Sequence, residues 1–144
     1  MKSYPPKMLP TLLKRVPAFA EARTEDDSFI SHDDDGPYLC FGDLDRYLLE
    51  LLTQESNTPH AAETTRQIFE LLNEMGNSSD PNVVNIVATT VFEGLAGMPE
   101  GVIAGRRNLT GQAAEEFERT VSWFSPHSQS NLRRALIKLR TWLQ

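Results

Sequence analysis

Two stretches of this chain open with the same helix-start signal, a capping residue followed directly by proline. Asn57-Thr58-Pro59 opens the first stretch, and Asp80-Pro81 opens the second. Proline is favoured at the first position of a helix, where its missing N–H would have no partner. Apolar residues then follow at the spacing of one helix face until Gly76 in the first stretch, and nearly all round the helix axis in the second. The sequence therefore predicts two helices, with the second in the middle of the fold.

Helical periodicity covers most of the remaining chain, and no repeat of fixed length occurs in it. The other predicted helical segments are two short pieces within residues 8–22 broken by Pro10 and Pro17, a helix from Gly42 or Asp43, a helix from Thr110 that ends at Ser125-Pro126, and a last helix after Ser130. We predict an all-α fold with a single helical domain over residues 1–144. Short connections favour a bundle or a HEAT-like stack of about five to six helices.

A glycine-rich stretch follows the predicted central helix. It comes after a helix rather than a strand, and no Gly-Lys-Ser or Gly-Lys-Thr sequence ends it, so it lacks the features of a phosphate-binding loop. We expect its glycines to be helix-stop and turn residues, in a segment over residues 94–108 that is a turn, a short helix or a mobile loop. These glycines are Gly94, Gly97, Gly101 and Gly105.

Length and composition exclude several classes of protein. A chain of 144 residues has the size of one domain, and 40% apolar with 24% charged residues exclude an intrinsically disordered or fibrous protein. No run of eighteen apolar residues occurs, and prolines with a Lys-Arg pair interrupt the first sixteen residues, so we expect no membrane span and no export signal. Cys40 is the single cysteine, which favours a reducing compartment, the cytoplasm.

The net charge of −6 is unevenly distributed. Residues 17–105 hold seventeen acids against three arginines, whereas residues 1–16 and 106–144 are both net basic. The densest acidic stretch lacks helical periodicity, so we predict an acidic loop near residues 23–41. Such a loop either serves solubility alone or forms a docking surface for a basic partner.

Metal binding is disfavoured although His32-Asp33-Asp34-Asp35 places four possible ligands together. An EF-hand loop aligned on Gly36 needs a bidentate carboxylate at its twelfth position, where this chain has Gly42. The sequence predicts no specific metal site and no cofactor.

No recognisable pattern ties a nucleophile to a base. Cys40 lies in the apolar run Tyr38-Leu39-Cys40-Phe41, which is typical of a core cysteine rather than a reactive thiolate. His32, His60 and His127 fall in predicted loops or helix starts. We therefore predict that the chain is not an enzyme. A small hydrolase stays open as an alternative, which loss of turnover in Cys40→Ala or His32→Ala would support.

The basic residues of the predicted last helix are the main candidates for nucleic-acid contact: Arg133, Arg134, Lys138 and Arg140. The acidic middle of the chain would repel the same phosphates, and no stacking aromatic motif accompanies these residues. No direct binding of nucleic acid is predicted.

Four blocks of the chain carry a resemblance to a known group of proteins. They are Phe41-Gly42-Asp43-Leu44-x-x-Tyr47-Leu48, Ile68-Phe69-Glu70-Leu71-Leu72, the segment from Asn82-x-Val84 to Val91-Phe92-Glu93-Gly94-Leu95, and Leu109-Thr110-Gly111 leading to Trp123. Over residues 38–124 the sequence resembles small all-helical bacterial domains, some of which look like immunity proteins of secreted-toxin systems (contact-dependent inhibition or type VI). The resemblance implies a protein that inhibits a toxin, and it brings no catalytic motif that can be carried over.

Charge supports the same expectation by an independent route. Nuclease toxins are usually basic because they bind phosphates, and an acidic inhibitor surface is steered onto them by long-range attraction. We expect this chain to bind and neutralise a cognate toxin, as a monomer or weak homodimer, by blocking the active site or an exosite. The predicted partner-binding residues are Asp26, Asp27, Asp33, Asp34, Asp35, Asp43, Asp45, Glu50 and Glu55. The alternative is an intracellular adaptor or regulator with a helical-repeat-like surface, whose partner need not be basic.

Overall fold

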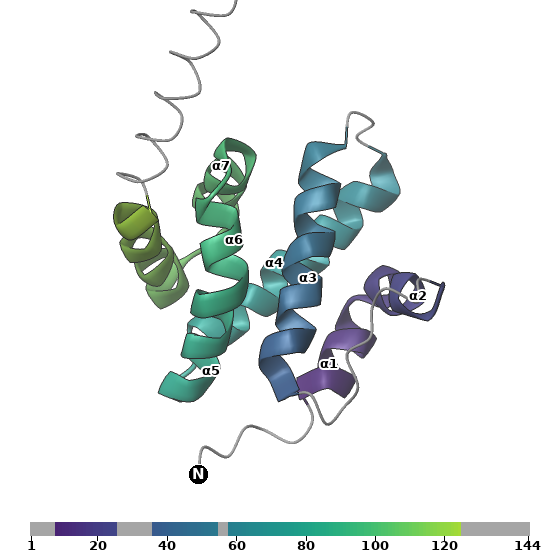
Figure 1. The fold of residues 1–144 in the computed structure, drawn as a ribbon, viewed down its shortest axis with the longest axis horizontal. Helices are drawn as coiled ribbons and strands as arrows, with labels where there is room; N and C mark the ends of the chain where they lie inside the picture. The colour runs from purple at the N-terminus through teal and green to yellow at the C-terminus, as the bar shows by residue number, and fades with distance from the viewer. Residues whose placement is uncertain (1–7, 26–35, 55–57, 125–144) are drawn as a thin grey trace, which may run out of the picture.

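The computed structural model describes residues 8–25, 36–54 and 58–124, whose arrangement is shown in Figure 1. Within these ranges the chain is helical apart from short connections, and no strand occurs. The predicted all-α fold is therefore confirmed. The acidic residues between 26 and 35 and the predicted helix after Ser130 lie outside the described residues.

Two short helices open the described chain, as predicted. α1 spans Met8–Arg15 and α2 spans Pro17–Glu25. Pro17 is the first residue of α2, where no N–H is needed, so the break falls just before it. Pro10 does not break α1, contrary to the prediction, because it lies in the first turn, where a helix tolerates proline.

α3 spans Gly36–Thr53 and begins well before its predicted start. Cys40, Leu44 and Leu48 are all buried at a spacing of four residues, so one apolar stripe continues toward the N-terminal end of the helix. Residues 23–25 at the end of α2 and residues 36–41 at the start of α3 are helical, although the sequence analysis assigned both to the acidic loop.

α4 (Pro59–Gly76) and α5 (Pro81–Val87) begin where the capping signals predict. The hydroxyl of Thr58 accepts a hydrogen bond from a first-turn N–H at 3.1 Å, and the carboxylate of Asp80 does the same at 2.9 Å. Each bond satisfies one of the backbone donors that the first turn of a helix leaves open. Both predicted starts are confirmed.

The central segment runs from α5 through a π-helix, η2 (Ala88–Phe92), into α6 (Glu93–Ala96). The wider turn disturbs the regular ladder of backbone hydrogen bonds, and threonine hydroxyls bond to carbonyls beside it. Thr89 and Thr90 each donate to the carbonyl four residues earlier, at 2.7 and 2.6 Å. The segment contacts α3, α4 and α7, which confirms its predicted place in the middle of the fold.

The stretch over residues 94–108 is mostly helical, because α7 spans Pro99–Asn108. The prediction that its glycines are stop and turn residues is wrong for Gly94, which lies inside α6, and for Gly101 and Gly105, which lie inside α7 and are buried. A Cβ at Gly101 would overlap the backbone of Leu95, and one at Gly105 would overlap the ring of Phe117. These two glycines therefore allow neighbouring segments to approach α7 closely.

A further helix covers residues 111–124, and two asparagines, one within α4 and one directly after it, fix the turn that leads into this helix. Asn73 accepts a hydrogen bond from the N–H of Thr110 at 2.8 Å and donates one to the carbonyl of Asn108 at 2.8 Å. Asn77 donates to the carbonyl of Thr110 at 3.1 Å. These bonds hold the turn against the end of α4.

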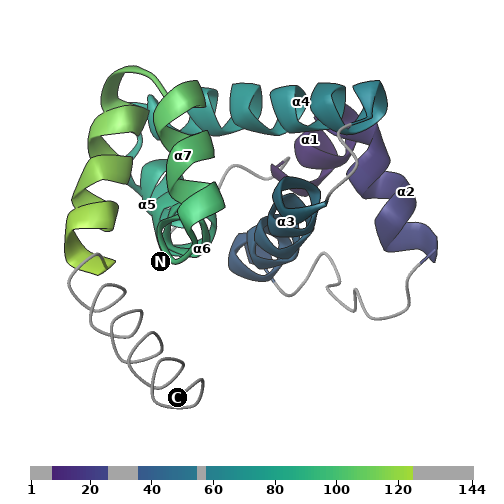
Figure 2. The same cartoon turned by 90° about the horizontal axis from the view of Figure 1, so that it is seen from above.

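Figure 2 shows α4 lying across one side of the molecule, with α3 and the α5–α6 segment beneath it. α3 and α6 run side by side in both views and are in contact. Large side chains from these layers, from α1 and α2 and from the helix over residues 111–124 are almost fully buried, and each contributes about 1.5–3 kcal/mol on burial. The largest are Phe19, Phe41, Phe92, Phe117, Leu12, Leu44, Leu48, Ile68, Leu72, Ile86 and Leu95.

Candidate protein-interaction site

The structure describes three of the predicted partner-binding residues, all on α3: Asp43, Asp45 and Glu50. The others, Asp26, Asp27, Asp33, Asp34, Asp35 and Glu55, lie outside the described residues. Chain connectivity places the five aspartates between the end of α2 and the start of α3. The described part of the candidate surface is therefore the region where these two helices meet.

Two exposed glutamates lie near Tyr47, where α2 packs on α3. The rings of Phe19 and Tyr47 meet with centroids 5.5 Å apart, which holds the two helices together. Burial raises the pKa of Tyr47, and the carboxylates of Glu21 and Glu50 raise it further. Glu21 of α2 and Glu50 of α3 therefore both lie close enough to Tyr47 to act on its hydroxyl. The sequence analysis left Glu21 out of the site, although its helix leads into the acidic segment.

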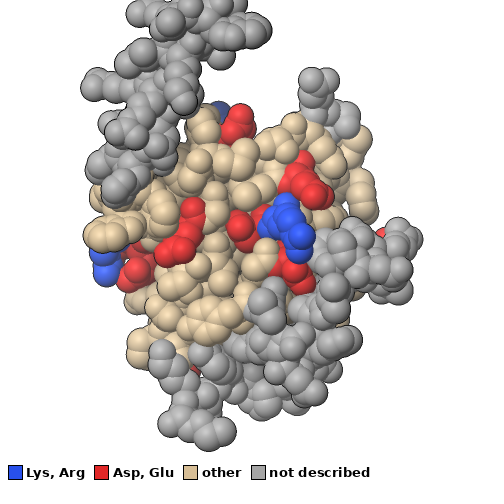
Figure 3. Space-filling model, viewed as in Figure 1, with Lys and Arg blue, Asp and Glu red and all other residues tan. Residues whose placement is uncertain are grey.

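Asp43 is largely covered and is paired with an arginine of its own helix. Its side chain is 13% exposed, and its Oδ1 accepts a hydrogen bond from Nη2 of Arg46 at 2.9 Å. Figure 3 shows acidic side chains around a basic group over α3. The charge of Asp43 is therefore partly compensated by Arg46.

Asp45 does not lie on the open polar side of α3, where the sequence analysis placed it. It faces α6 at Gly94, where a Cβ would overlap its carboxylate. Its Oδ1 is buried and has no hydrogen-bond partner. Burial raises the pKa of Asp45 to about 7. This carboxyl is therefore a partly neutral group within a helix contact rather than an exposed charge for a partner.

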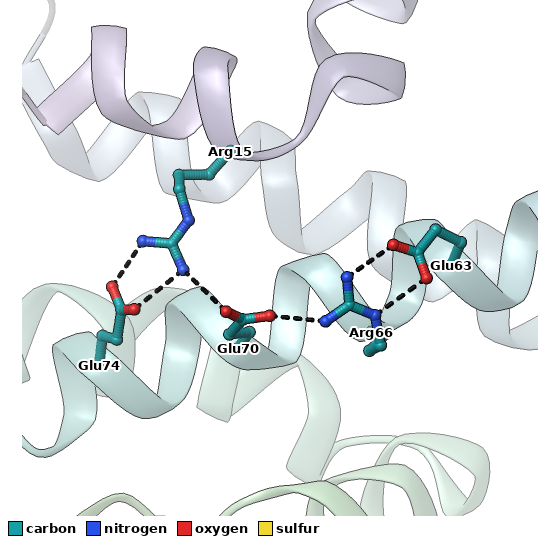
Figure 4. A network of polar contacts seen from close by, with 5 residues as sticks. All are labelled: Arg15, Glu63, Arg66, Glu70 and Glu74. Atoms are coloured by element: carbon teal, nitrogen blue, oxygen red, sulfur yellow. Dashed lines mark hydrogen bonds and ion pairs between the residues drawn. The ribbon is translucent and has the colours of Figure 1, made fainter.

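An extended ion-pair network joins α1 to α4, as Figure 4 shows. Arg15 of α1 approaches Glu74 at 2.6 Å and Glu70 at 3.7 Å. Arg66 approaches the same Glu70 at 2.7 Å and Glu63 at 2.6 Å. Hydrogen bonds from the arginines hold the pKa values of Glu63 and Glu74 below the usual range. With two arginines against three glutamates, this network compensates most of the charge of the glutamates and links α1 to α4.

Where α2 meets α3, two glutamates form no ion pair within the described part of the chain. Among the described residues, the arginines in ion pairs are Arg15, Arg46, Arg66, Arg106 and Arg119. Neither Glu21 nor Glu50 forms an ion pair with another described residue. We name Glu21, Asp43 and Glu50 the acidic α2–α3 surface.

A groove of 640 Å³ lies between the end of α3, the start of α4 and one face of α7. Its α7 side presents Ile103, which is 55% exposed, between the charged residues Glu100 and Arg107. The apolar part of its lining consists of Leu51, Leu52, Ala61, Ala62, Ile103 and Ala104. A concave surface with an apolar floor and a charged rim can accept an apolar side chain of a partner.

The candidate catalytic groups are not brought together in the described part of the chain. Cys40 is 3% exposed within the core, as its apolar context predicts, and His60 is exposed at the start of α4. His32 and His127 lie outside the described residues. Over residues 8–25, 36–54 and 58–124, no group of three or more His, Cys, Asp or Glu residues is placed to hold a metal ion. In the same ranges, no helix is both long enough and apolar enough to span a bilayer.

Comparison with known proteins gives one match. Residues 9–130 match the family described as "Domain of unknown function (DUF7674)". No curated protein and no solved structure matches the chain. Because the matched residues cover most of the sequence, the chain belongs to the DUF7674 family.

Proposed function

We propose that this domain is an immunity protein, which binds and neutralises a cognate basic, nuclease-type toxin in the cytoplasm by blocking its active site or an exosite. The acidic α2–α3 surface supports the proposal most directly. Glu21 and Glu50 are exposed there without an ion pair among the described residues. α2 carries Glu21 and α3 carries Glu50, and five further aspartates lie between these two helices in the sequence.

The physical basis of the proposal is the rate of association. Charges on facing surfaces attract before contact and raise the rate constant for association well above that of uncharged surfaces. Added salt screens this attraction within about 10 Å at 0.1 M ionic strength. Binding through the acidic surface therefore becomes slower as salt is added, and it becomes slower when one of the carboxylates is replaced by lysine.

Co-expression tests the function. The product of the adjacent reading frame is expressed in bacteria alone and then together with this protein. We expect growth arrest that co-expression relieves, together with a complex that is stable in gel filtration. A harmless neighbour, or a toxic one that this protein neither binds nor neutralises, would contradict the proposal.

Charge reversal tests the assigned surface. Glu50→Lys is compared with Glu115→Lys, a matched change at an exposed position on the helix over residues 111–124. Neither glutamate forms an ion pair with another described residue, so the two variants change the net charge equally without breaking such a pair. We expect Glu50→Lys to slow association at low salt about tenfold and Glu115→Lys to slow it much less. Equal effects would remove the acidic α2–α3 surface from the interface.

The groove favours a second candidate function, that of an adaptor which binds a partner helix through an aliphatic or aromatic side chain. The exposed Ile103 is the observation behind this candidate. An adaptor of this kind would lose its partner on Ile103→Asp and would keep it on Glu50→Lys. The immunity protein proposed above would keep its toxin on Ile103→Asp and would bind it more slowly on Glu50→Lys.

A further inference from the structure

The contact between α3 and α6 contains a polar group that this fold leaves unsatisfied. Oδ1 of Asp45 is buried without a hydrogen-bond partner. The carboxylate occupies the space that a side chain at position 94 would fill, so Gly94 is what allows α6 to lie this close to α3. A buried carboxylate without a partner is costly when ionised and much less costly when protonated. The protonation state of Asp45 therefore affects how favourably the two helices pack.

The surroundings of Asp45 offer little charge to offset ionisation. α5 and η2, which pack against α3, contain no charged residue. α6 contributes Glu93, and the titratable neighbours on α3 itself are Tyr38, Asp43, Arg46, Tyr47 and Glu50. The charged residues on the other helices packed against α3 are Lys14 and Arg15 on α1, Glu21, Arg23 and Glu25 on α2, Glu63, Arg66, Glu70 and Glu74 with His60 on α4, and Glu100, Arg106 and Arg107 on α7.

The pKa of Asp45 has one physical cause for its shift. Burial, rather than any of these charges, raises the pKa of Asp45. Glu63 and Glu74 have pKa values held below their usual range, so they stay ionised between pH 5 and 7. Between pH 5 and 7, a difference in pH dependence between the unaltered protein and an Asp45 variant therefore reports on the titration of Asp45.

We propose that the contact between α3 and α6 is a pH-sensitive joint, closed when Asp45 is protonated and loosened when Asp45 ionises. The packed state favours the protonated carboxyl, so it binds a proton more tightly than the opened state does. The extra stability of the packed state is fully present when the pH is below the ordinary pKa of an aspartate. It is lost as the pH rises to about 7. Acidification therefore tightens the joint.

Amide hydrogen exchange of the whole protein measures this effect. The protection factors of Leu95 and Ala96 in α6, corrected for the intrinsic exchange rate at each pH, report how often the joint opens. A pKa that rises from its ordinary value to about 7 on packing allows at most about a fiftyfold increase in opening from pH 5 to pH 7. Because part of the carboxyl still meets water, we expect an increase of about tenfold.

Two variants make the test specific to Asp45. Asp45→Asn keeps the shape of the side chain and removes the titration, so its protection factors should change less than about twofold over the same range. Glu93→Gln is the matched control, because it removes an exposed carboxylate next to Gly94, and it should retain the full pH dependence. A carbon-13 titration of the Asp45 carboxyl gives an independent readout.

The proposal is overturned if the Asp45 carboxyl titrates near its ordinary pKa, or if Asp45→Asn shows the same pH dependence of protection as the unaltered protein. It is also overturned if Glu93→Gln loses the dependence to the same extent as Asp45→Asn. These measurements use the protein alone, so their outcome is independent of whether the proposed immunity function holds.

Discussion

The contact between Gly94 and Asp45 predicts opposite effects of the same substitution at two helical glycines. Gly42 lies on an exposed part of α3, and a Cβ built there meets no atom within 4 Å. Alanine is better than glycine in a helix interior by about 1 kcal/mol. We therefore expect Gly42→Ala to raise the free energy of unfolding by about 0.5–1 kcal/mol.

Gly94→Ala gains the same helix propensity but forces a methyl group onto the carboxylate of Asp45. Overpacking of this kind costs about 1–3 kcal/mol, which exceeds the gain in propensity. We expect the free energy of unfolding to fall by about 1 kcal/mol relative to the unaltered protein. Urea denaturation at pH 7, followed by far-ultraviolet circular dichroism, measures both variants in the same way.

A double-mutant cycle isolates the contact. In the Asp45→Ala background the carboxylate is absent, so Gly94→Ala should be neutral or stabilising, with a coupling energy of about 1–2 kcal/mol between the two sites. The reasoning is refuted if Gly94→Ala stabilises the original protein as much as Gly42→Ala does. It is equally refuted if the cost of Gly94→Ala is unchanged when Asp45 is alanine.

Three further variants test other parts of the fold by the same denaturation assay. Asn73→Ala should destabilise the protein by about 2 kcal/mol, because it removes hydrogen bonds to the turn around Thr110; an unchanged midpoint would show that these bonds contribute nothing. Gly101→Ala should cost at least about 2 kcal/mol, since its Cβ would meet the backbone of Leu95, which cannot rotate away; a stabilised variant would contradict the packing of α7. Asp80→Ala should cost about 1 kcal/mol through loss of the helix cap, and Asp80→Asn should restore most of it.

Local signals in the sequence predicted much of the fold. The caps at Thr58 and Asp80 depend on residues within one turn of the helix start, so the sequence analysis located them correctly. The start of α3 was missed because the acidic residues before it outweighed the apolar stripe through Cys40 and Leu44. The π-helix depends on how the central segment packs against its neighbours, and periodicity alone does not reveal such a turn.

The candidate site was harder to predict than the fold, because exposure depends on tertiary contacts. Helical spacing places Asp45 off the main apolar stripe of α3, and a helix with one buried face would leave it in water. α3 is contacted on more than one side, and the missing side chain of Gly94 lets α6 cover Asp45. Glu21 was missed for the converse reason, since its approach to Tyr47 depends on how α2 packs against α3.

We propose that the acidic α2–α3 surface steers this domain onto a basic partner. This steering is tested most directly by the association rate constant with the toxin identified by co-expression, measured at low and at high salt. The account predicts a rate constant that falls at least about tenfold between roughly 0.02 and 0.3 M salt, and a smaller fall for Glu50→Lys. A rate constant that is independent of salt, or a salt dependence that Glu50→Lys leaves unchanged, would contradict it.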